Sequence, residues 1–530
     1  MQHFTKKSIA VLSLLFATTA ARAEIKLPAQ FSSHMVIQQK KPVRLWGTAE
    51  PGETIKVTLA GRSAEVRAND AGKFQVELPP LDAKADAGPH ELVFTGKNTV
   101  TLKNVVVGEV WLCSGQSNMR LTVKECANAD AEIKAANFDQ IRLLYVPDAS
   151  TPTPQTTFQG KWTPCASRSV SGFSATAYYF GRELHQQLGV PIGLIDTSRG
   201  WSPGEAWIPL DVLESDPITK PIVDRQRKMI SNGDLDQQEK NYQADLKLWK
   251  EEQAKAKEEA TAAGKTPSTQ PTRARPRRAW GIDPRLRPEA LYNAMLVPLA
   301  PMSLGGVIWY QGESNTDRAV QYRAMLPLII NHWRKIFEAP ELPFGIVQLP
   351  QHANREKPVD GTWAELREAQ WKTYRSVPQT GMIVTTDIGE TYNIHPLNKQ
   401  DVGKRLAGWA LGSVYGKSDV PTSPIYKTAK VEGGVMRIEF DGNFKSLKLK
   451  EDSGFTIAGA DRKFVKAEVK VDGKSIVVSS SEVSAPVAVR FGFLDDPKAT
   501  LFSEAGLPVS PFRTDDWPGV TDQVLTVDWQ

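Results

Sequence analysis

Apolar and polar residues alternate in short segments near both ends of the chain. In residues 24–105 such segments include residues 55–59 and 73–78, and Gly, Pro and Asn-Asp turns separate them. The alternation returns from about residue 423, for example in residues 435–440. A period of two is typical of half-buried β-strands. It predicts an all-β sandwich domain over residues 24–105 and a second β domain over residues 421–530.

The pattern between these regions is different. A dense apolar run at residues 105–112 is followed by a helical period at residues 174–188 and a second buried run at residues 189–196. The rhythm then resumes with strands expected at 306–310, 342–349 and 381–386, and with helices expected at 292–299, 321–337 and 363–374. Strands that alternate with helices are typical of a parallel sheet with helices on its faces. Residues 106–420 are therefore predicted to form an α/β domain.

One stretch inside this domain, at about residues 220–285, has almost nothing to bury. It begins rich in Lys, Glu, Gln and Ala and continues rich in Pro, Thr and Arg. We expect a solvated helix or helical hairpin followed by a mobile loop. Its arginines could be taken for an anion site, but a charge run more often marks a solvated surface. They are Arg273, Arg275, Arg277 and Arg278.

Residues 1–23 have the features of a secretory signal peptide. Lys6 and Lys7 precede a short apolar run, and Ala21-Arg22-Ala23 has the small-x-small form that signal peptidase accepts. The run is too short to span a bilayer. We expect export to the periplasm or beyond the cell, and no membrane span. Without this segment the formal net charge falls from +5 to +2, which argues against a nucleic-acid partner.

The chain has three cysteines, Cys113, Cys126 and Cys165. In an exported protein Cys126 and Cys165 could form a disulfide, whereas Cys113 lies in an apolar run and should be a small buried side chain. These cysteines and the seven histidines offer no ligand set with metal-binding spacing. We therefore expect no metal site.

The segment Ser114-Gly-Gln-Ser117 follows the first apolar run of the α/β domain directly. A serine at a glycine-assisted turn after a buried strand lies at the carboxyl edge of the sheet, where open α/β sheets bind ligands. The turn also supplies backbone N–H donors for an oxyanion. A helix N-cap would explain a lone serine equally well.

Three further segments place polar residues at strand ends and favour catalysis over a cap. They are Ile195–Trp207, Trp309–Asn315 and Thr386–Pro396. Because the carboxyl ends of parallel strands lie along one edge, we expect these segments to converge near Ser117.

Three motifs in these segments resemble the sialate O-acetylesterase family of the SGNH (GDSL-like) hydrolase superfamily. They are Gly115-Gln-Ser-Asn-Met119, Tyr310-Gln-Gly-Glu-Ser-Asn315 and Ile394-His-Pro-x-x-Lys399, in the family's order. The resemblance runs from about residue 24 to Trp517. It implies a flavodoxin-like three-layer α/β/α SGNH hydrolase domain with flanking all-β sandwich modules. It also implies a serine esterase that removes O-acetyl groups from sialic acid or from a plant polysaccharide such as xylan, without a cofactor.

Carried over residue by residue, the resemblance makes Ser117 the nucleophile and His395 its general base. A serine hydroxyl needs such a base at neutral pH, and histidine titrates in the right range. Gly200 and Gln311 would join the Ser117 N–H as oxyanion donors, with Asn315 as a substitute for Gln311.

The acid partner of His395 is open. Many superfamily members have an aspartate three residues before the histidine, where this chain has Tyr392, and Asn393 is uncharged as well. Glu313 and Asp387 are the two candidates. A Ser–His dyad supported by a backbone carbonyl is the alternative.

The substrate pocket departs from the family's pattern. Members commonly have Trp-Gly-Gly-Thr where this chain has Arg199-Gly-Trp-Ser202, so Arg199 and Trp201 could reshape the sugar pocket. Of the tryptophans near the predicted site, Trp111 and Trp309 lie on strands and are expected in the core, whereas Trp201 is the better candidate for a sugar contact.

Two other function classes are consistent with parts of the sequence. A catalytically inactive carbohydrate-binding protein would use the β modules but would not need the serine and the histidine. An SGNH lipase or thioesterase would need an apolar lid, and no long apolar segment suggests one. The acetylated position, the glycan and the oligomeric state are not readable from the sequence.

Overall fold

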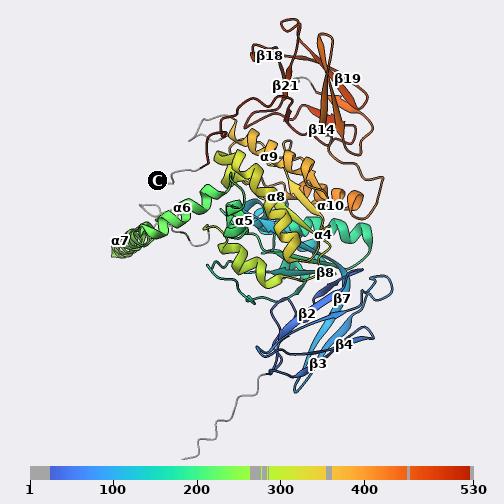
Figure 1. The fold of residues 1–530 in the computed structure, drawn as a ribbon, viewed down its shortest axis with the longest axis vertical. Coiled ribbons are helices and arrows are strands. Elements are labelled where there is room, and N and C mark those ends of the chain that lie inside the picture. Colours follow the sequence, from blue (N-terminus) through green and yellow to red (C-terminus); the bar gives the residue numbers. More distant parts are fainter. Residues whose placement is uncertain are drawn as a thin grey trace, which may run out of the picture.

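The structure is a computed structural model that describes residues 24–262, 286–353, 361–450 and 454–525, together with Pro276 and Asp283. Three parts follow one another along its long axis, with N-terminal strands at one end, an α/β part in the middle and C-terminal strands at the other end (Figure 1). The expected signal peptide and the four arginines of residues 273–278 lie outside the described residues.

The N-terminal part consists of short strands, as the alternating pattern predicts. β2 and β5 pair with each other, and β3 lies between β4 and β6. Buried and exposed side chains alternate along β3 and β5, since one face of each strand packs on the core. The strands are β1 (Val36–Gln38), β2 (Val43–Thr48), β3 (Thr54–Leu59), β4 (Arg62–Arg67), β5 (Lys73–Leu78) and β6 (His90–Thr95).

One long strand, β7 (Thr99–Gly115), joins this part to the centre of the molecule. Its first half pairs antiparallel with β6, and its second half lies between two parallel strands of the central sheet. The predicted domain boundary at residue 105 thus falls within a continuous strand. The N-terminal strands and the central sheet also share one hydrophobic core, which includes Ile25 and Ile425.

The central sheet is mixed and has the order β13-β12-β11-β7-β10-β8-β9. Neighbours from β13 to β8 are parallel, and only the edge strand β9 is antiparallel to its neighbour along this path. The carboxyl ends of β7, β10, β11, β12 and β13 therefore lie along one edge, as expected. The bounds are β8 (Asn137–Tyr145), β9 (Thr163–Ala166), β10 (Ile192–Asp196), β11 (Gly306–Tyr310), β12 (Phe344–Val347) and β13 (Thr380–Ile383).

Helices cover both faces of this sheet. In β12, Phe344 contacts Trp333 of α8 (Ala319–Ile336), whereas the next residue, Gly345, lies against Trp409 of α10 (Lys399–Ser413). Successive strand residues point to opposite faces, so α8 and α10 lie on opposite sides. α9 (Thr362–Ser376) packs on α8, and α4 (Ala175–Leu188) packs on α10.

Most of the predicted central elements are confirmed, with bounds shifted by a few residues, but the region predicted as a short helix at 292–299 is π-helical and then 3-10 helical. The shorter helices are α1 (Ser117–Arg120), η1 (Val123–Glu125), α2 (Ala129–Ala135), α3 (Ser167–Val170), η2 (Gly204–Trp207), α5 (Leu210–Glu214), η3 (Tyr292–Leu296), η4 (Val297–Leu299) and η5 (Glu313–Arg318).

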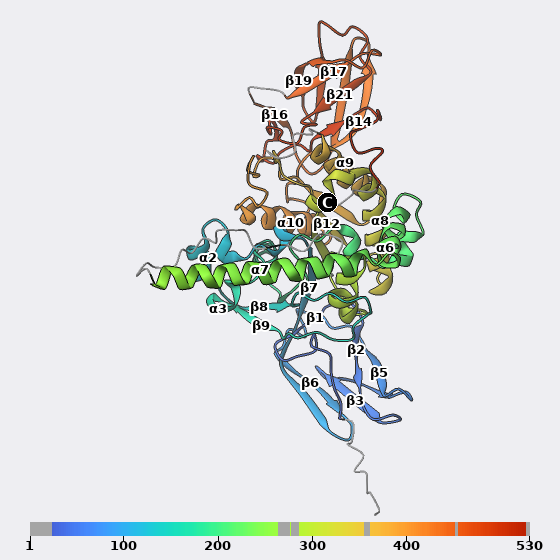
Figure 2. The same ribbon diagram turned by 90° about the vertical axis from the view of Figure 1, so that its left-hand side faces the viewer.

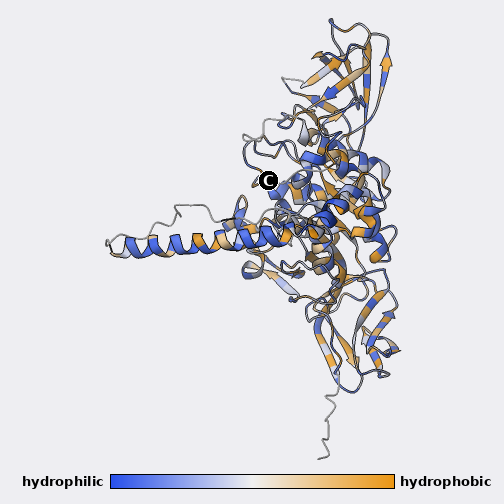
Figure 3. Ribbon diagram, turned by 60° about the vertical axis from the view of Figure 1, so that its left-hand side comes forward, coloured by the Kyte–Doolittle hydropathy of each residue, from blue (hydrophilic) through white to orange (hydrophobic). Residues whose placement is uncertain are grey.

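The charged insertion contains two helices, α6 (Lys220–Ser231) and α7 (Asp234–Ala262). α7 passes in front of the central part in Figure 2, and Figure 3 shows that it projects away from the body of the molecule and is hydrophilic over most of its length. Within α7 only Leu235 is buried, which fits the expectation of a solvated helix. No helix in the described ranges is long and apolar enough to cross a membrane.

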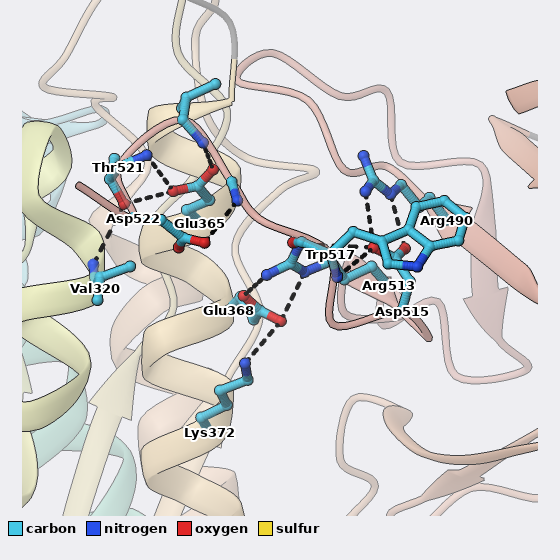
Figure 4. Close-up of polar contacts among 12 residues, drawn as sticks. Val320, Glu365, Glu368, Lys372, Arg490, Arg513, Asp515, Trp517, Thr521 and Asp522 are labelled. Atoms are coloured by element: carbon cyan, nitrogen blue, oxygen red, sulfur yellow. Dashed lines mark hydrogen bonds and ion pairs between the residues drawn. The ribbon is translucent and has the colours of Figure 1, made fainter. Parts of the chain in front are cut away.

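The C-terminal strands enclose a second, separate core that includes Ile438, Ile457 and Phe512. Polar contacts join them to α9. Arg513 forms two hydrogen bonds of 2.9 Å with Glu368, and Thr521 N donates to Glu365 Oε2 at 2.9 Å (Figure 4). The strands are β14 (Ile425–Glu432), β15 (Val435–Asp441), β16 (Leu447–Leu449), β17 (Phe455–Ala458), β18 (Phe464–Lys466), β19 (Glu468–Asp472), β20 (Ser475–Ser479), β21 (Ala488–Phe491), β22 (Leu501–Ser503) and β23 (Phe512–Arg513).

Candidate active site

Ser117 lies in a tight turn between β7 and the short helix α1. The last residue of β7, Gly115, has φ +140°, and a Cβ there would lie 2.1 Å from the carbonyl oxygen of Tyr310. The next amide, Gln116 N, donates to that same carbonyl at 2.9 Å. Only glycine fits this close approach, because any side chain would collide with the backbone of β11. The turn leaves Ser117 half-buried at the carboxyl edge of the sheet.

A buried amide network supports the turn from below. Gln116 Oε1 accepts hydrogen bonds from Gln311 Nε2 at 3.2 Å, Gly312 N at 3.3 Å and Ser314 N at 3.2 Å. Gln311 is fully buried, and its Nε2 also lies 2.8 Å from Asn315 Oδ1 and 3.3 Å from the Ser202 carbonyl oxygen. An amide nitrogen has two N–H groups, so these protein acceptors are enough to engage both.

The network ends in a buried ion pair that sequence reasoning missed. Asn315 Nδ2 donates to Glu205 Oε2 at 2.9 Å, and Arg318 Nη2 donates to Glu205 Oε1 at 2.8 Å. Burial alone would raise the pKa of Glu205, but the Arg318 charge and the Asn315 amide outweigh it, and the pKa is lowered. Asn315 and Gln311, both predicted oxyanion donors, therefore have their amides directed into the protein.

Gly200, the other predicted oxyanion donor, lies directly beside the serine. A Cβ placed on Gly200 would be 3.9 Å from Ser117 Cβ. The preceding residue is fixed to the same turn, because Arg199 N donates to the Gly115 carbonyl oxygen at 3.0 Å. The structure thus brings the loop after β10 against the loop after β7.

His395 belongs to a loop that is shaped by its own polar side chains. Asn393 Oδ1 accepts from His395 N at 3.0 Å. Glu390 in turn accepts from Asn393 Nδ2 at 3.0 Å and from Leu397 N at 2.9 Å. These bonds close the chain between Glu390 and Leu397 into a compact loop, with the His395 ring half-buried.

A second group of contacts joins this loop to the serine turn. Asn118, the residue after Ser117, donates from Nδ2 to the Ile394 carbonyl oxygen at 2.9 Å. Lys399 Nζ donates to Asn118 Oδ1 at 2.7 Å and to the Pro396 carbonyl oxygen at 2.7 Å. The carbonyl groups of the two residues that flank His395 are therefore both connected to Asn118, the neighbour of Ser117. Ile394 is bonded to it directly, and Pro396 is connected to it through Lys399. We call Asn118 and Lys399 the clamp.

Asn118 and Lys399 lie within the family motifs, but the sequence alone indicates no role for them. Lys399 is fully buried, and burial lowers its pKa to about 8. A buried lysine between two loops is a signal that only the fold reveals, since Asn118 and Lys399 are far apart in the chain. Neither residue type indicates a contact by itself.

The pKa of His395 is lowered, first by burial and then by the positive charge of Lys399, although Glu125 opposes the shift. A lowered pKa keeps the imidazole neutral at neutral pH, as a general base requires. In the part of the chain that the structure describes, no hydrogen bond joins the ring to the Ser117 hydroxyl or to a carboxylate. Such bonds are often long in unliganded enzymes and tighten when substrate binds.

The two predicted acids have other partners. Glu313 is buried, which raises its pKa, and its Oε1 accepts from Asn118 Nδ2. Asp387 forms two bonds of 2.6 Å with the Arg405 guanidinium. This ion pair lines a cavity of about 910 Å³ between α10 and the C-terminal part, and neither Ser117 nor His395 lines it. Among the described residues, no hydrogen bond or ion pair joins either carboxylate to His395.

Cys126 and Cys165, which could have formed a disulfide, are not paired. Both residues, like Cys113, are buried free thiols. Cys126 Sγ donates to the Thr122 carbonyl oxygen at 3.3 Å. Burial raises the pKa of Cys126 to about 11 and that of Cys165 to about 12, so both stay protonated at neutral pH. No group of three or more His, Cys, Asp and Glu side chains among the described residues could hold a metal ion.

Comparisons with known proteins identify carbohydrate esterases as relatives of this chain. The family model described as "Carbohydrate esterase, sialic acid-specific acetylesterase" matches residues 279–411, which include Gln311 and His395. The sialate O-acetylesterase of Mus musculus is 26% identical over 95% of this chain and 97% of its own length. That of Rattus norvegicus is 29% identical over 74% of each chain.

A solved structure is similar over nearly the whole molecule. The crystal structure of a carbohydrate acetylesterase from Xanthomonas citri is 32% identical to this chain, with a TM-score of 0.75. The match covers 93% of this chain and 100% of that one. The likeness therefore includes the β strands at both ends as well as the central sheet.

Proposed function

Since this chain belongs to the sialate O-acetylesterase family, we propose that Ser117 is the nucleophile and His395 the general base of its reaction. The chain is a carboxylic ester hydrolase that removes O-acetyl groups from carbohydrates. The alternative of an inactive binding protein is not favoured by these relatives, which are named as esterases.

The proposed reaction has two steps. The Ser117 hydroxyl attacks the acetyl carbonyl carbon while His395 takes its proton, and the carbonyl oxygen becomes an oxyanion. The ester C–O bond then breaks, and the sugar hydroxyl leaves with the proton from His395. Water attacks the acetyl-serine and gives its proton to His395, acetate leaves, and Ser117 regains its proton.

Backbone N–H groups are the proposed main oxyanion donors. The first turn of a helix leaves N–H groups without intrahelical acceptors, so the Ser117 N–H is a suitable donor. The position of Gly200 beside Ser117 supports the Gly200 N–H as the second. Because the Gln311 and Asn315 amides already have protein acceptors, we propose that they act mainly by holding the turn.

One observation carries the proposal for the Ser117–His395 pair. The Asn118 side chain bonds to the residue before His395 and is itself the neighbour of Ser117. Two loops that follow different strands are thereby held together at the two residues that the chemistry needs. The pair works as a dyad in this proposal, because Glu313 and Asp387 are bonded to Asn118 and Arg405.

The first test is Ser117→Ala, assayed on 4-nitrophenyl acetate. Removing a serine nucleophile costs on the order of 1,000-fold or more in kcat, while the midpoint of thermal unfolding should hardly move. Ser114→Ala is the matched control from the same turn, because the Ser114 hydroxyl is buried and has no hydrogen-bond partner among the described residues. Full activity of Ser117→Ala would rule out the nucleophile.

The substrate is proposed to be an O-acetylated sialic acid or an acetylated plant polysaccharide such as xylan. The relatives' names include both sialate O-acetylesterases and a carbohydrate acetylesterase. Release of acetate from a panel of acetylated glycans distinguishes these substrates. Preference for octanoyl over acetyl esters would instead favour the lipase alternative.

We also propose the finer fold, domain limits and location. The order β10-β7-β11-β12-β13 corresponds to the flavodoxin-like order 2-1-3-4-5, with β8 and β9 added beyond β10. On either side of this catalytic part we propose β-sandwich modules at residues 24–105 and 421–530. Residues 1–23 are proposed as a signal peptide for export, which predicts a mature protein that begins near Glu24.

A further inference from the structure

Trp201 is largely exposed to solvent and follows Gly200 in the chain. A Cβ placed on Gly200 would lie 3.9 Å from Ser117 Cβ, and 56% of the Trp201 surface is exposed. The other tryptophans near the site, Trp111, Trp207 and Trp309, are fully buried. Core packing therefore explains those three, whereas Trp201 is more than half exposed.

The loop that carries Trp201 is fixed on both sides of it. Arg199 Nη1 donates to the Gly200 carbonyl oxygen at 2.7 Å, and Arg199 Nε lies 3.5 Å from Asp148 Oδ2. Ser202 is fully buried, and its Oγ donates to the Arg199 carbonyl oxygen at 2.7 Å. Trp207 Nε1 donates to the same Ser202 Oγ at 3.0 Å. The position of the Trp201 backbone is thus determined by its neighbours.

The backbone of Trp201 is also in an unfavourable conformation. Its φ is +65°, a left-handed value that costs a bulky residue about 1–2 kcal/mol and costs glycine nothing. Strain of this kind, held in place by surrounding bonds, is typical of residues that bind or react.

We propose that Trp201 is a stacking platform for the pyranose ring of the acetylated sugar. An aromatic face beside polar loops suits the apolar C–H face of a sugar ring. A ring stacked there would lie next to Gly200 and Ser117, where its acetyl group could reach the hydroxyl. This inference rests on the proposed function, since it names the substrate contact of that site.

The test compares esters with and without a sugar. Wild type, Trp201→Gly and Trp201→Phe are assayed on 4-nitrophenyl acetate and on two glycans, acetylated xylan and an O-acetylated sialic acid. For the glycan that wild type hydrolyses, the ratio of its kcat/KM to that of 4-nitrophenyl acetate should fall on the order of 10-fold in Trp201→Gly. Trp201→Phe, which keeps an aromatic face, should retain most of the ratio.

Thermal unfolding provides a readout that separates folding from activity. Because glycine accepts φ +65° without strain, the strain that Trp201→Gly relieves offsets the partial burial that it loses, and the variant should unfold near the wild-type temperature although it loses glycan activity. An unchanged ratio of the two kcat/KM values in Trp201→Gly would overturn the platform. Equal losses of activity on 4-nitrophenyl acetate and on the glycan, together with a lower unfolding temperature, would also overturn it. A wild-type protein that hydrolyses neither 4-nitrophenyl acetate nor either glycan would instead overturn the proposed function.

Discussion

The two halves of the proposed dyad are held in different ways. The Ser117 turn follows β7, a central strand with parallel neighbours on both sides, and backbone atoms fix it through Gly115 and Gln116. The His395 loop follows β13, which is the edge strand of the sheet. Side chains hold that loop, chiefly the clamp residues Asn118 and Lys399.

Because of this difference, substitutions in the two halves should affect the stability of the fold and the esterase activity to different degrees. A change at Gly115, where the serine turn lies against the backbone of β11, disturbs the packing of β7 against β11 and must affect the fold. A change in the clamp releases a surface loop at the sheet edge and should affect mainly the placement of the base. Substitutions at Gly115 in the serine turn should therefore lower the unfolding temperature, whereas substitutions in the clamp should mainly lower kcat.

The largest effect is expected from Gly115→Ala on the serine side. Its Cβ would lie 2.1 Å from the Tyr310 carbonyl oxygen at a φ of +140°, so backbone must move. We expect a loss of about 3 kcal/mol or more in stability, together with loss of esterase activity. Differential scanning calorimetry and 4-nitrophenyl acetate hydrolysis measure the two effects.

Gly61→Ala is the matched control for Gly115→Ala. Gly61 also has a positive φ, +75°, but no atom lies within 4 Å of its added Cβ. The free energy of unfolding of Gly61→Ala should fall by only about 1 kcal/mol, because alanine is strained at a positive φ, and the variant should keep its esterase activity. If the two variants unfold at the same temperature, the contact with Tyr310 does not hold the turn.

The backbone-held half is also the half that sequence reasoning describes better. The apolar run before Ser114 and the glycine at position 115 predict a strand that ends in a tight turn, and both are present. Such features are local, because one stretch of chain contains the pattern and its consequence. The continuation of β7 from the N-terminal part into the central sheet is not local. It depends on pairing with strands from both parts, and the apolar pattern of β7 itself does not reveal it.

The side-chain-held half was harder to predict for physical reasons. Helix α10 was missed, since its glycines lower helix propensity; one of them, Gly403, is needed because its Cβ would lie 2.5 Å from Tyr179 Cβ on α4. The clamp depends on distances between residues far apart in the chain. The pairing of Cys126 and Cys165 stayed open for the same reason, because sequence spacing does not report whether two thiols meet.

A smaller effect, on rate alone, is expected from Lys399→Met on the histidine side. Methionine fills the buried space but cannot donate to Pro396 and Asn118. A base displaced by about 1 Å costs on the order of 100-fold in rate, so kcat should fall 10- to 100-fold with little change in KM. The unfolding temperature should change far less than in Gly115→Ala, because loss of two hydrogen bonds is partly offset by removal of a buried charge.

Lys404→Met is the control for that substitution. Lys404 lies on the same helix α10 but is exposed, so its replacement should leave kcat at the wild-type value. Full kcat in Lys399→Met would mean that the His395 loop keeps its place without the clamp. The contrast between the two halves would then be incorrect.

The smallest effect is expected in the pH dependence of kcat/KM, which reports the free enzyme. His395 must be neutral to accept the serine proton, so activity falls as the pH drops through its pKa. Burial and the Lys399 charge lower that pKa from 6.5, and the acid limb of wild type should therefore lie below pH 6.5. Lys399→Met removes one cause, because imidazolium no longer faces a positive neighbour, and the limb should move to higher pH. Lys404→Met should leave the limb in place. A limb that stays in place or moves to lower pH in Lys399→Met would show that Lys399 does not lower the pKa of the titrating base, and hence that this base is not the imidazole beside the clamp.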